Sequence, residues 1–212
     1  MKRLIVFFLF LTSTIIAFGQ RAGIEVSPGL TVPGANVSPG LGFSSGFYYD
    51  QPIYKKLGVS TGVLYTRLSA TDRSPTCLAS PDIPCPEKIQ DQFGVIEIPV
   101  DVTIDVTMPP NADWEVYLKA GYSFGYIVRQ QKVRHFPERK TSREITSLKG
   151  LRSHSHFFRI GFEVQRSISE QINISMGGQY KFAGIYQQFY GGFSNYNIFV
   201  KLGYNFPKGT ED

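Results

Sequence analysis

The feature that most constrains this chain is a two-residue alternation of bulky apolar side chains with small or polar ones. It is clearest at residues 96–106, where one set of alternate positions holds only Ile and Val. The positions between them hold Glu, Pro, Asp and Thr. Because successive residues of a β-strand point to opposite faces, this pattern predicts a strand with one apolar and one polar face.

The alternation recurs along the chain and predicts eight strands, near residues 22–30, 41–50, 57–68, 96–106, 114–128, 156–166, 171–182 and 196–206. The segments after the second, fourth and sixth of these are short, whereas the others are longer, especially 69–92 and 129–155. Outer-membrane barrels have short periplasmic turns and long extracellular loops. We therefore predict an all-β, eight-stranded, antiparallel, up-and-down transmembrane β-barrel with both termini in the periplasm.

Alternation alone does not decide whether the apolar face points into a core or out to lipid, since a soluble barrel shows the same period. Three observations favour lipid. Residues 114–128 keep one apolar face, whereas strands of soluble proteins most often have about five or six residues. The apolar face is too bulky to fill the narrow interior of eight strands, and the opposite face is rich in Gly and Ser. Aromatic residues such as Trp114 and Tyr126 gather near strand ends, as in interfacial girdles.

Residues 1–19 have the organisation of a secretory signal peptide. Two basic residues are followed by an apolar run, and Ala17 and Gly19 occupy the small-residue positions of a cleavage site. We expect residues 20–212 to form the barrel domain, with a short periplasmic tail at 207–212. Without the two basic residues of the signal the chain has 20 basic and 17 acidic residues, a balance that argues against nucleic acid as a partner.

The two cysteines of the chain, Cys77 and Cys85, bracket a short Pro-containing segment. In an exported protein two such close cysteines are expected to form a disulfide. The segment offers too few other ligands for a metal site. We predict a local Cys77–Cys85 disulfide within the long loop that follows the third strand.

Five short segments carry a resemblance to a known group of proteins: 17–20, 58–65, 97–99, 119–122 and 201–206. With them the chain resembles the outer-membrane β-barrel domain proteins of Bacteroidota, a porin-family or PorT-like group. The resemblance covers the mature chain and implies a barrel without one established activity. The strand that ends at Phe206 resembles the signal that the barrel-assembly machinery reads, which makes that machinery an expected partner, although the tail follows it here.

The predicted inward face carries charges of both signs. Charges in a narrow interior must pair, because an unpaired buried charge costs several kcal/mol. We interpret them as an ionic network that plugs the barrel; the alternative is a narrow gated path for small solutes. A wide pore is excluded, since water-filled channels have about 16 strands. The predicted network consists of Glu25, Glu97, Asp101, Lys119, Arg159, Glu163, Lys181 and Lys201.

The segment from Arg129 to Arg152 has eight basic and two acidic residues, in a chain that is close to balanced elsewhere. The outer leaflet is dense in lipopolysaccharide phosphates, which Arg and Lys bind. We therefore predict that this long extracellular loop contacts outer-membrane lipid and lipopolysaccharide. The residues predicted to make the contact are Arg129, Lys132, Arg134, Arg139, Lys140 and Arg143.

His154, Ser155 and His156 raise the alternative of an enzyme that acts on lipid A. A hydrolytic triad needs its nucleophile, base and acid within hydrogen-bond reach. The alternation places both histidines outward and Ser155 inward, and no acid has the matching spacing. We therefore expect a monomeric, non-enzymatic barrel without catalytic residues, cofactor or metal, serving envelope integrity or surface binding.

Overall fold

The computed structural model describes residues 20–33, 38–72, 85–108, 113–136, 141–145, 154–183 and 193–206. The predicted signal peptide and the tail 207–212 lie outside these residues. The strands are β1 (Arg21–Pro33), β2 (Ser38–Tyr54), β3 (Leu57–Asp72), β4 (Lys88–Asp105), β5 (Trp114–His135), β6 (Thr141–Ile145), β7 (His154–Ser167), β8 (Ile172–Ala183) and β9 (Phe193–Asn205). In the described part of the chain no helix is long and apolar enough to span a membrane.

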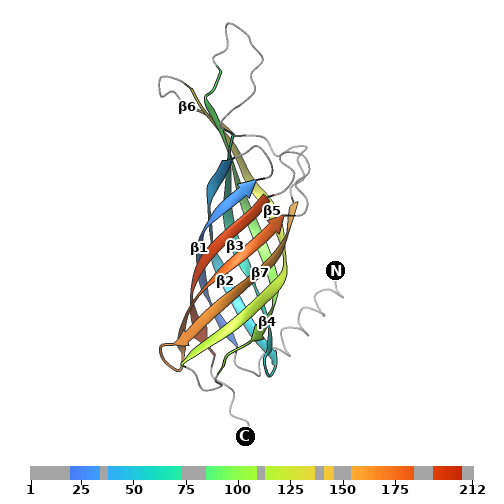
Figure 1. Cartoon of the computed structure of the whole chain (residues 1–212), viewed down its shortest axis with the longest axis vertical. Coiled ribbons are helices and arrows are strands. Elements are labelled where there is room, and N and C mark those ends of the chain that lie inside the picture. The colour runs from blue at the N-terminus through green and yellow to red at the C-terminus, as the bar shows by residue number, and fades with distance from the viewer. Residues whose placement is uncertain are drawn as a thin grey trace, which may run out of the picture.

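Eight of these strands form a closed barrel (Figure 1). Their order is β4-β3-β2-β1-β9-β8-β7-β5, and β4 also pairs with β5, so that the sheet closes on itself. Every pairing is antiparallel. The predicted eight-stranded, antiparallel barrel is therefore confirmed. Closure satisfies the backbone groups of all eight strands, which a sheet surrounded by lipid requires.

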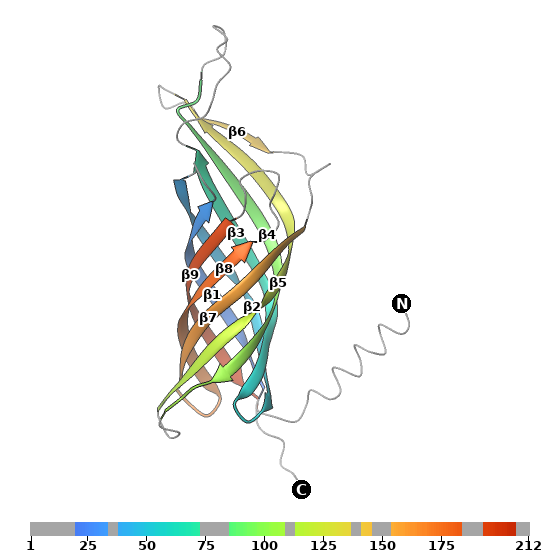
Figure 2. The ribbon, with the colours of Figure 1, turned by 45° about the vertical axis from the view of Figure 1, so that its right-hand side comes forward.

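At one end of the barrel the strands are longer than predicted. β4 begins eight residues before the predicted 96, and β5 continues to His135. Residues 129–135 and 141–145, predicted as loop, form a hairpin in which β6 pairs with the upper part of β5. Figure 2 shows β4, β5 and β6 rising beyond the other strands. The prediction failed here because alternation of polar with polar residues gives no apolar period to detect.

The opposite end of the barrel is compact. β2 and β3 are joined by a two-residue turn at Lys55 and Lys56, and Lys55 has a φ of 38°, in the left-handed region. The backbone N–H of Phe206 donates to the carbonyl of Gln20 at 2.9 Å, which ties the two ends of the described barrel together. Short turns, together with the start of β1 and the end of β9 at the same end, are the arrangement expected for the periplasmic side.

A β-bulge interrupts the pairing of β4 with β5. Gly94 pairs with Arg129 and Val95 with Ile127, so Val128 is an extra residue on β5. A bulge changes which face the following side chains occupy. Before it the odd-numbered residues of β5 point inward; after it Arg129 lies on the outer face, opposite the alternation that the sequence shows up to Val128.

Candidate functional site: a closed ionic interior and a basic outer rim

All eight residues of the predicted charge network lie inside the barrel and are buried. They come from six strands, β1, β4, β5, β7, β8 and β9, in which inward positions alternate with lipid-facing ones. Sequence alternation therefore located the interior set, and the register of the strands decides which members meet.

The lower part of this network centres on Glu163 of β7. Lys119 forms an ion pair with Glu163, and the Nζ of Lys201 lies 3.1 Å from the same carboxylate. Lys201 also pairs with Glu25, with 3.5 Å between Nζ and Oε2, and lies over the ring of Tyr48. One carboxylate thus bridges two ammonium groups, an arrangement that offsets part of the cost of burying them.

Two further pairs lie above this group. The guanidinium of Arg159 is 3.3 Å from Asp101, and the Nζ of Lys181 is 3.0 Å from the Oε2 of Glu97. Ser123 donates a hydrogen bond to Glu97 at 3.3 Å. Lys181 and Glu97 are among the most completely buried side chains of the described barrel.

Apolar side chains close the interior above the ion pairs. The buried cluster consists of Leu68, Ala70, Phe93, Val95, Ile127 and Phe157. Beside the ion pairs the interior holds a cavity of about 10 Å³ that is lined by Asp101, Lys119, Arg159 and Lys201, among others. This is about the space that one water molecule occupies. The side chains around this cavity are therefore closely packed.

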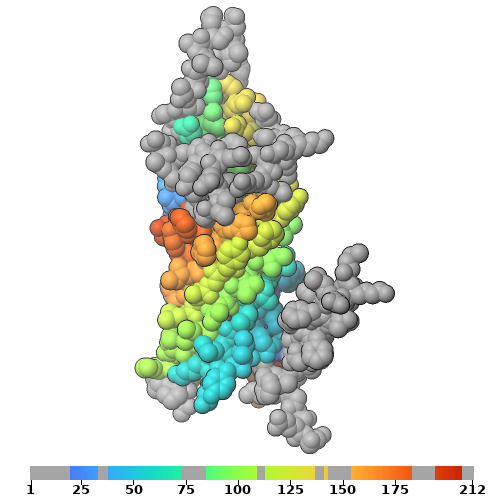
Figure 3. All heavy atoms as spheres, turned by 90° about the vertical axis from the view of Figure 1, so that its right-hand side faces the viewer, coloured from blue at the N-terminus to red at the C-terminus, as the bar shows by residue number. Residues whose placement is uncertain are grey.

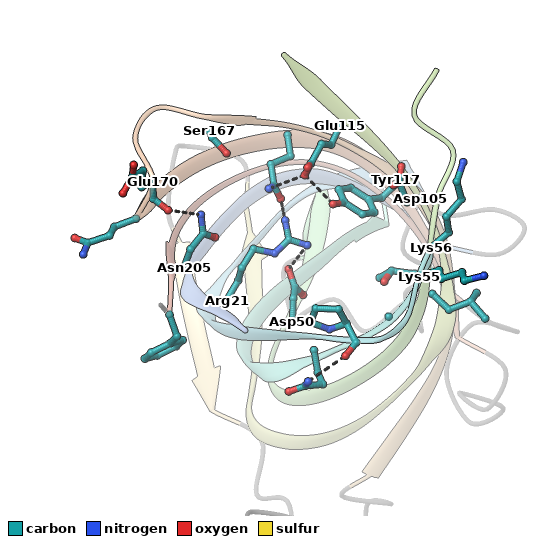
Figure 4. A pocket seen from close by; sticks show the side chains of 18 residues that line it. Arg21, Asp50, Lys55, Lys56, Asp105, Glu115, Tyr117, Ser167, Glu170 and Asn205 are labelled. Atoms are coloured by element: carbon teal, nitrogen blue, oxygen red, sulfur yellow. Dashed lines mark hydrogen bonds and ion pairs between the residues drawn. The ribbon is translucent and has the colours of Figure 1, made fainter. Parts of the chain in front are cut away.

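The periplasmic mouth holds a larger cavity of about 630 Å³, drawn in Figure 4. Arg21 lies at its centre, 3.8 Å from Asp50, and donates a hydrogen bond to Gln165. Gln165 in turn donates to Glu115 at 3.1 Å, and the hydroxyl of Tyr117 donates to the same carboxylate at 2.8 Å. This network lies between the periplasmic opening and the buried ion pairs.

Arg21 and Asp50 also lie in the interior, and the predicted network does not include them. Asp50 shares the inward parity of residues 42, 44 and 46, so the alternation could have found it; Arg21 lay just outside the predicted first strand. With them, five acidic and five basic side chains are ion-paired from the mouth to the apolar cluster: Glu25, Asp50, Glu97, Asp101 and Glu163 with Arg21, Lys119, Arg159, Lys181 and Lys201. These ten ion-paired side chains are therefore balanced in charge, whereas Glu115 at the mouth accepts hydrogen bonds from neutral donors.

Most of the residues predicted to form the basic loop lie on strands in the structure. Arg129, Lys132, Arg134 and Arg143 lie on strands β5 and β6, and Arg139 and Lys140 lie outside the described residues. Lys132 and Arg134 are on the face that continues the barrel interior, where Lys132 is 4.0 Å from Asp91. The expectation that all these residues belong to one loop was wrong, since β5 and β6 pair with one another. Arg129 is exposed on the outer wall.

The candidate hydrolytic residues do not assemble. Ser155 is fully buried inside the barrel, whereas His154 and His156 lie on its outer face. His156 forms a hydrogen bond with the hydroxyl of Tyr122, and His154 stacks on Phe124. The barrel wall thus separates the serine from both histidines, and the histidines belong to an aromatic cluster on the outer wall.

The structure describes only one of the two residues of the predicted disulfide. Cys85 is described just before β4, but Cys77 lies outside the described residues, so the disulfide between them stays a prediction. Within the described ranges no group of three or more His, Cys, Asp and Glu residues is placed to hold a metal ion.

The outer wall carries a belt of exposed apolar side chains. On β4 the outward residues are exposed by 40–51%: Ile96, Ile98, Val100, Val102 and Ile104. Equivalent exposed apolar residues lie on the other strands, whose atoms form oblique bands on the face shown in Figure 3. Exposed apolar surface of this extent is stable only against lipid or a partner. Transmembrane strands have about 9–11 residues in the hydrocarbon, which matches the length of this row.

Comparisons with known proteins support the fold. No protein-family model matches the chain, and no curated protein matches it. Among solved structures, Neisserial surface protein A has a TM-score of 0.57 at 14% identity, over 90% of this chain and 99% of that one. OprG from Pseudomonas aeruginosa (TM-score 0.47, 9% identity, 90% and 97% coverage) and Ail from Yersinia pestis (0.46, 13%, 89% and 99%) are less similar. At these identities the likeness concerns the fold alone.

The closed barrel, its lipid-facing belt and its short-turn end together decide the location. Closed antiparallel barrels with an outward apolar band belong to outer membranes. We therefore place the chain in the outer membrane of a Gram-negative bacterium. From the short turns typical of the periplasmic side, we infer that the compact end with Gln20 and Phe206 faces the periplasm and that the extension formed by β4, β5 and β6 faces outward from the cell.

Proposed function

We propose that this chain is a non-enzymatic, monomeric outer-membrane barrel that does not conduct solutes and that acts at its extracellular end. Its role would be envelope integrity or surface binding. The observation that carries the proposal is the interior: charge-balanced ion pairs, capped by an apolar cluster, fill the barrel between its two mouths. The relation to the Bacteroidota porin-family or PorT-like group belongs to this proposal and rests on the short sequence segments described above.

We expect the purified full chain to give no steady current in planar lipid bilayers. Ions would have to displace buried pairs such as Lys119–Glu163, and stranding one buried charge costs several kcal/mol. Insertion would be verified in parallel by protease protection of reconstituted vesicles. A steady, ohmic current from inserted protein would contradict the closed interior and favour the narrow-channel alternative.

The extracellular end favours binding of anionic surface polymers as the contribution of this barrel. The outward extension is built from β4, β5 and β6, and Arg129 is exposed on it without an ion pair to any described residue. Arg139 and Lys140 follow in the sequence between β5 and β6. Lipopolysaccharide phosphates are the nearest anions in an outer leaflet, and guanidinium groups bind phosphates in bidentate geometry.

A charge reversal in the segment between β5 and β6 tests this part of the proposal. We expect Arg139→Glu/Lys140→Glu to weaken binding of soluble dextran sulfate to the full chain in a zwitterionic detergent, and the salt dependence to become shallower. The matched control is Lys55→Glu/Lys56→Glu, the same change of charge at the opposite end of the barrel. Equal loss in both variants would show an effect of net charge and would contradict a site at the extracellular end.

A further inference from the structure

The outer wall of β3, β4 and β5 changes from apolar to polar within one row of paired residues. In the lower row Tyr65 pairs with Ile96, and Ile96 with Tyr126. In the next row toward the extracellular end, Gly94 pairs with Arg67 on one side and with Arg129 on the other. All three residues of the lower row are exposed apolar or aromatic side chains. The boundary therefore lies at the upper aromatic girdle, the height of lipid headgroups.

The row above the girdle has two arginines that flank a glycine. Neighbouring strands are about 4.8 Å apart, so the Cα atoms of Arg67 and Arg129 are roughly 10 Å from each other across Gly94. Both arginine side chains are exposed. A Cβ at position 94 would lie 2.7 Å from the hydroxyl oxygen of Tyr65. The phenol of Tyr65 thus occupies the space above the glycine and brings a third hydrogen-bond donor between the two guanidinium groups.

Glutamine amides hold both arginines on this face. Nη2 of Arg67 donates to the Oε1 of Gln92 at 2.5 Å, and Nη2 of Arg129 donates to the Oε1 of Gln131 at 2.9 Å. These are neutral acceptors, and a guanidinium has several more N–H donors to offer. Unlike the interior arginines, neither one forms an ion pair with a carboxylate of the described residues.

The two arginines line a groove of about 860 Å³ on the outer wall. Tyr65 and Phe43 contribute apolar surface to it, and Gln92 and Gln131 contribute polar surface. Its described lining contains no Asp or Glu. The groove therefore combines positive charge without an acidic partner in its described lining and hydrogen-bond donors from the guanidinium groups. Its lower border is apolar and continues into the lipid-facing belt.

We propose that Arg67, Arg129 and Tyr65 form a clamp for the phosphate headgroup of an outer-leaflet lipid. Arginines suit this ligand because their planar donor pairs match phosphate oxygens. The site favours a lipid over a free anion, because the acyl chains of a bound lipid would run down the wall along Ile96 and its neighbours. The β-bulge at Val128 is required, since it turns Arg129 to the outer face.

This inference deepens the surface-binding part of the proposed function and rests on the membrane position of the barrel. It does not depend on the closed interior or on the segment between β5 and β6. If the conductance or dextran sulfate results contradicted the proposed function, the clamp would still be tested by its own variants. If those variants contradicted the clamp, the proposed function would still be tested by conductance and dextran sulfate binding.

The experiment uses the full chain in a zwitterionic detergent and short-chain phosphatidic acid as the probe, with bound lipid counted by native mass spectrometry. We expect Arg67→Gln/Arg129→Gln to weaken phosphatidic acid binding at least about tenfold, since two charge-assisted hydrogen-bonding groups are lost. Tyr65→Phe should weaken it less. Phosphatidylcholine should bind weakly to every variant, and inorganic phosphate should not displace the lipid.

The matched control is Lys55→Gln/Lys56→Gln, which removes the same charge at the periplasmic turn and should leave phosphatidic acid binding unchanged. Wild-type affinity of the double arginine variant would overturn the clamp, as would an equal loss in the lysine control. Displacement of phosphatidic acid by inorganic phosphate at equal concentration would overturn the lipid as its ligand. Folding of each variant is verified by its heat-dependent mobility on gels, and a variant that fails this check is replaced by Arg67→Lys/Arg129→Lys, which keeps the charge and should lose part of the binding.

Discussion

Replacing Lys181 with methionine should destabilise the barrel by about 3–5 kcal/mol, the largest effect expected from a single substitution here. The ammonium group of Lys181 lies 3.0 Å from the carboxylate of Glu97, and both side chains are fully buried. Without Lys181, the buried carboxylate of Glu97 loses the cation of its ion pair and keeps the hydrogen bond from Ser123. The measurement is the free energy of unfolding in urea, with the protein folded in lipid vesicles.

The double variant Glu97→Met/Lys181→Met separates the cost of an unpaired charge from the value of the pair. Apolar replacement of a complete buried pair is often neutral, so the double variant should recover most of the stability lost in Lys181→Met. Lys56→Met, at the exposed β2–β3 turn, provides the control for loss of a lysine. If Lys181→Met were as stable as the Lys56 variant, the Lys181–Glu97 ion pair would not be contributing to the free energy of unfolding.

Replacing Val100 with arginine should cost about 2–4 kcal/mol, because this side chain would face the middle of the hydrocarbon. Val100 is the central member of the outward row on β4 and is 51% exposed. In water an exposed valine would tolerate the same change within about 0.5 kcal/mol. The free energy of unfolding is again measured in lipid vesicles.

The control for this variant lies on the same strand and the same outer face. Gln90 is paired with Thr71 and Val133 in the extension above the girdle. Gln90→Arg should change the free energy of unfolding by less than about 1 kcal/mol, the value expected near the membrane interface. Equal costs at both positions would mean that the belt does not define the hydrocarbon layer, and the orientation of the barrel in the membrane would have to be revised.

The clamp and the ion pairs place different demands on the same fold. Inside, charges are neutralised by partners from other strands, as Arg159 of β7 is by Asp101 of β4. On the outer rim, Arg67 and Arg129 have only amide acceptors among the described residues. The buried charges therefore stabilise the fold through their ion pairs. The two exposed arginines keep donors that are available to a ligand.

The amino-acid sequence by itself determined the barrel, its strand count and the inward position of Glu97 and Lys181. It could do so because side-chain direction in a strand follows a strict period of two, which is a local property of the chain. The belt of apolar residues was readable for the same reason.

Only the tertiary structure decided which inward charges meet, since Lys119 and Glu163 come together through the register of β5 with β7. It also decided that β4 and β5 continue above the membrane and that the bulge at Val128 turns Arg129 to the outer wall. Register and bulges depend on pairing between strands distant in sequence, and no local pattern encodes such pairing. Arg67 and Arg129 are 62 positions apart in the chain, and only closure of the sheet around Gly94 makes them neighbours.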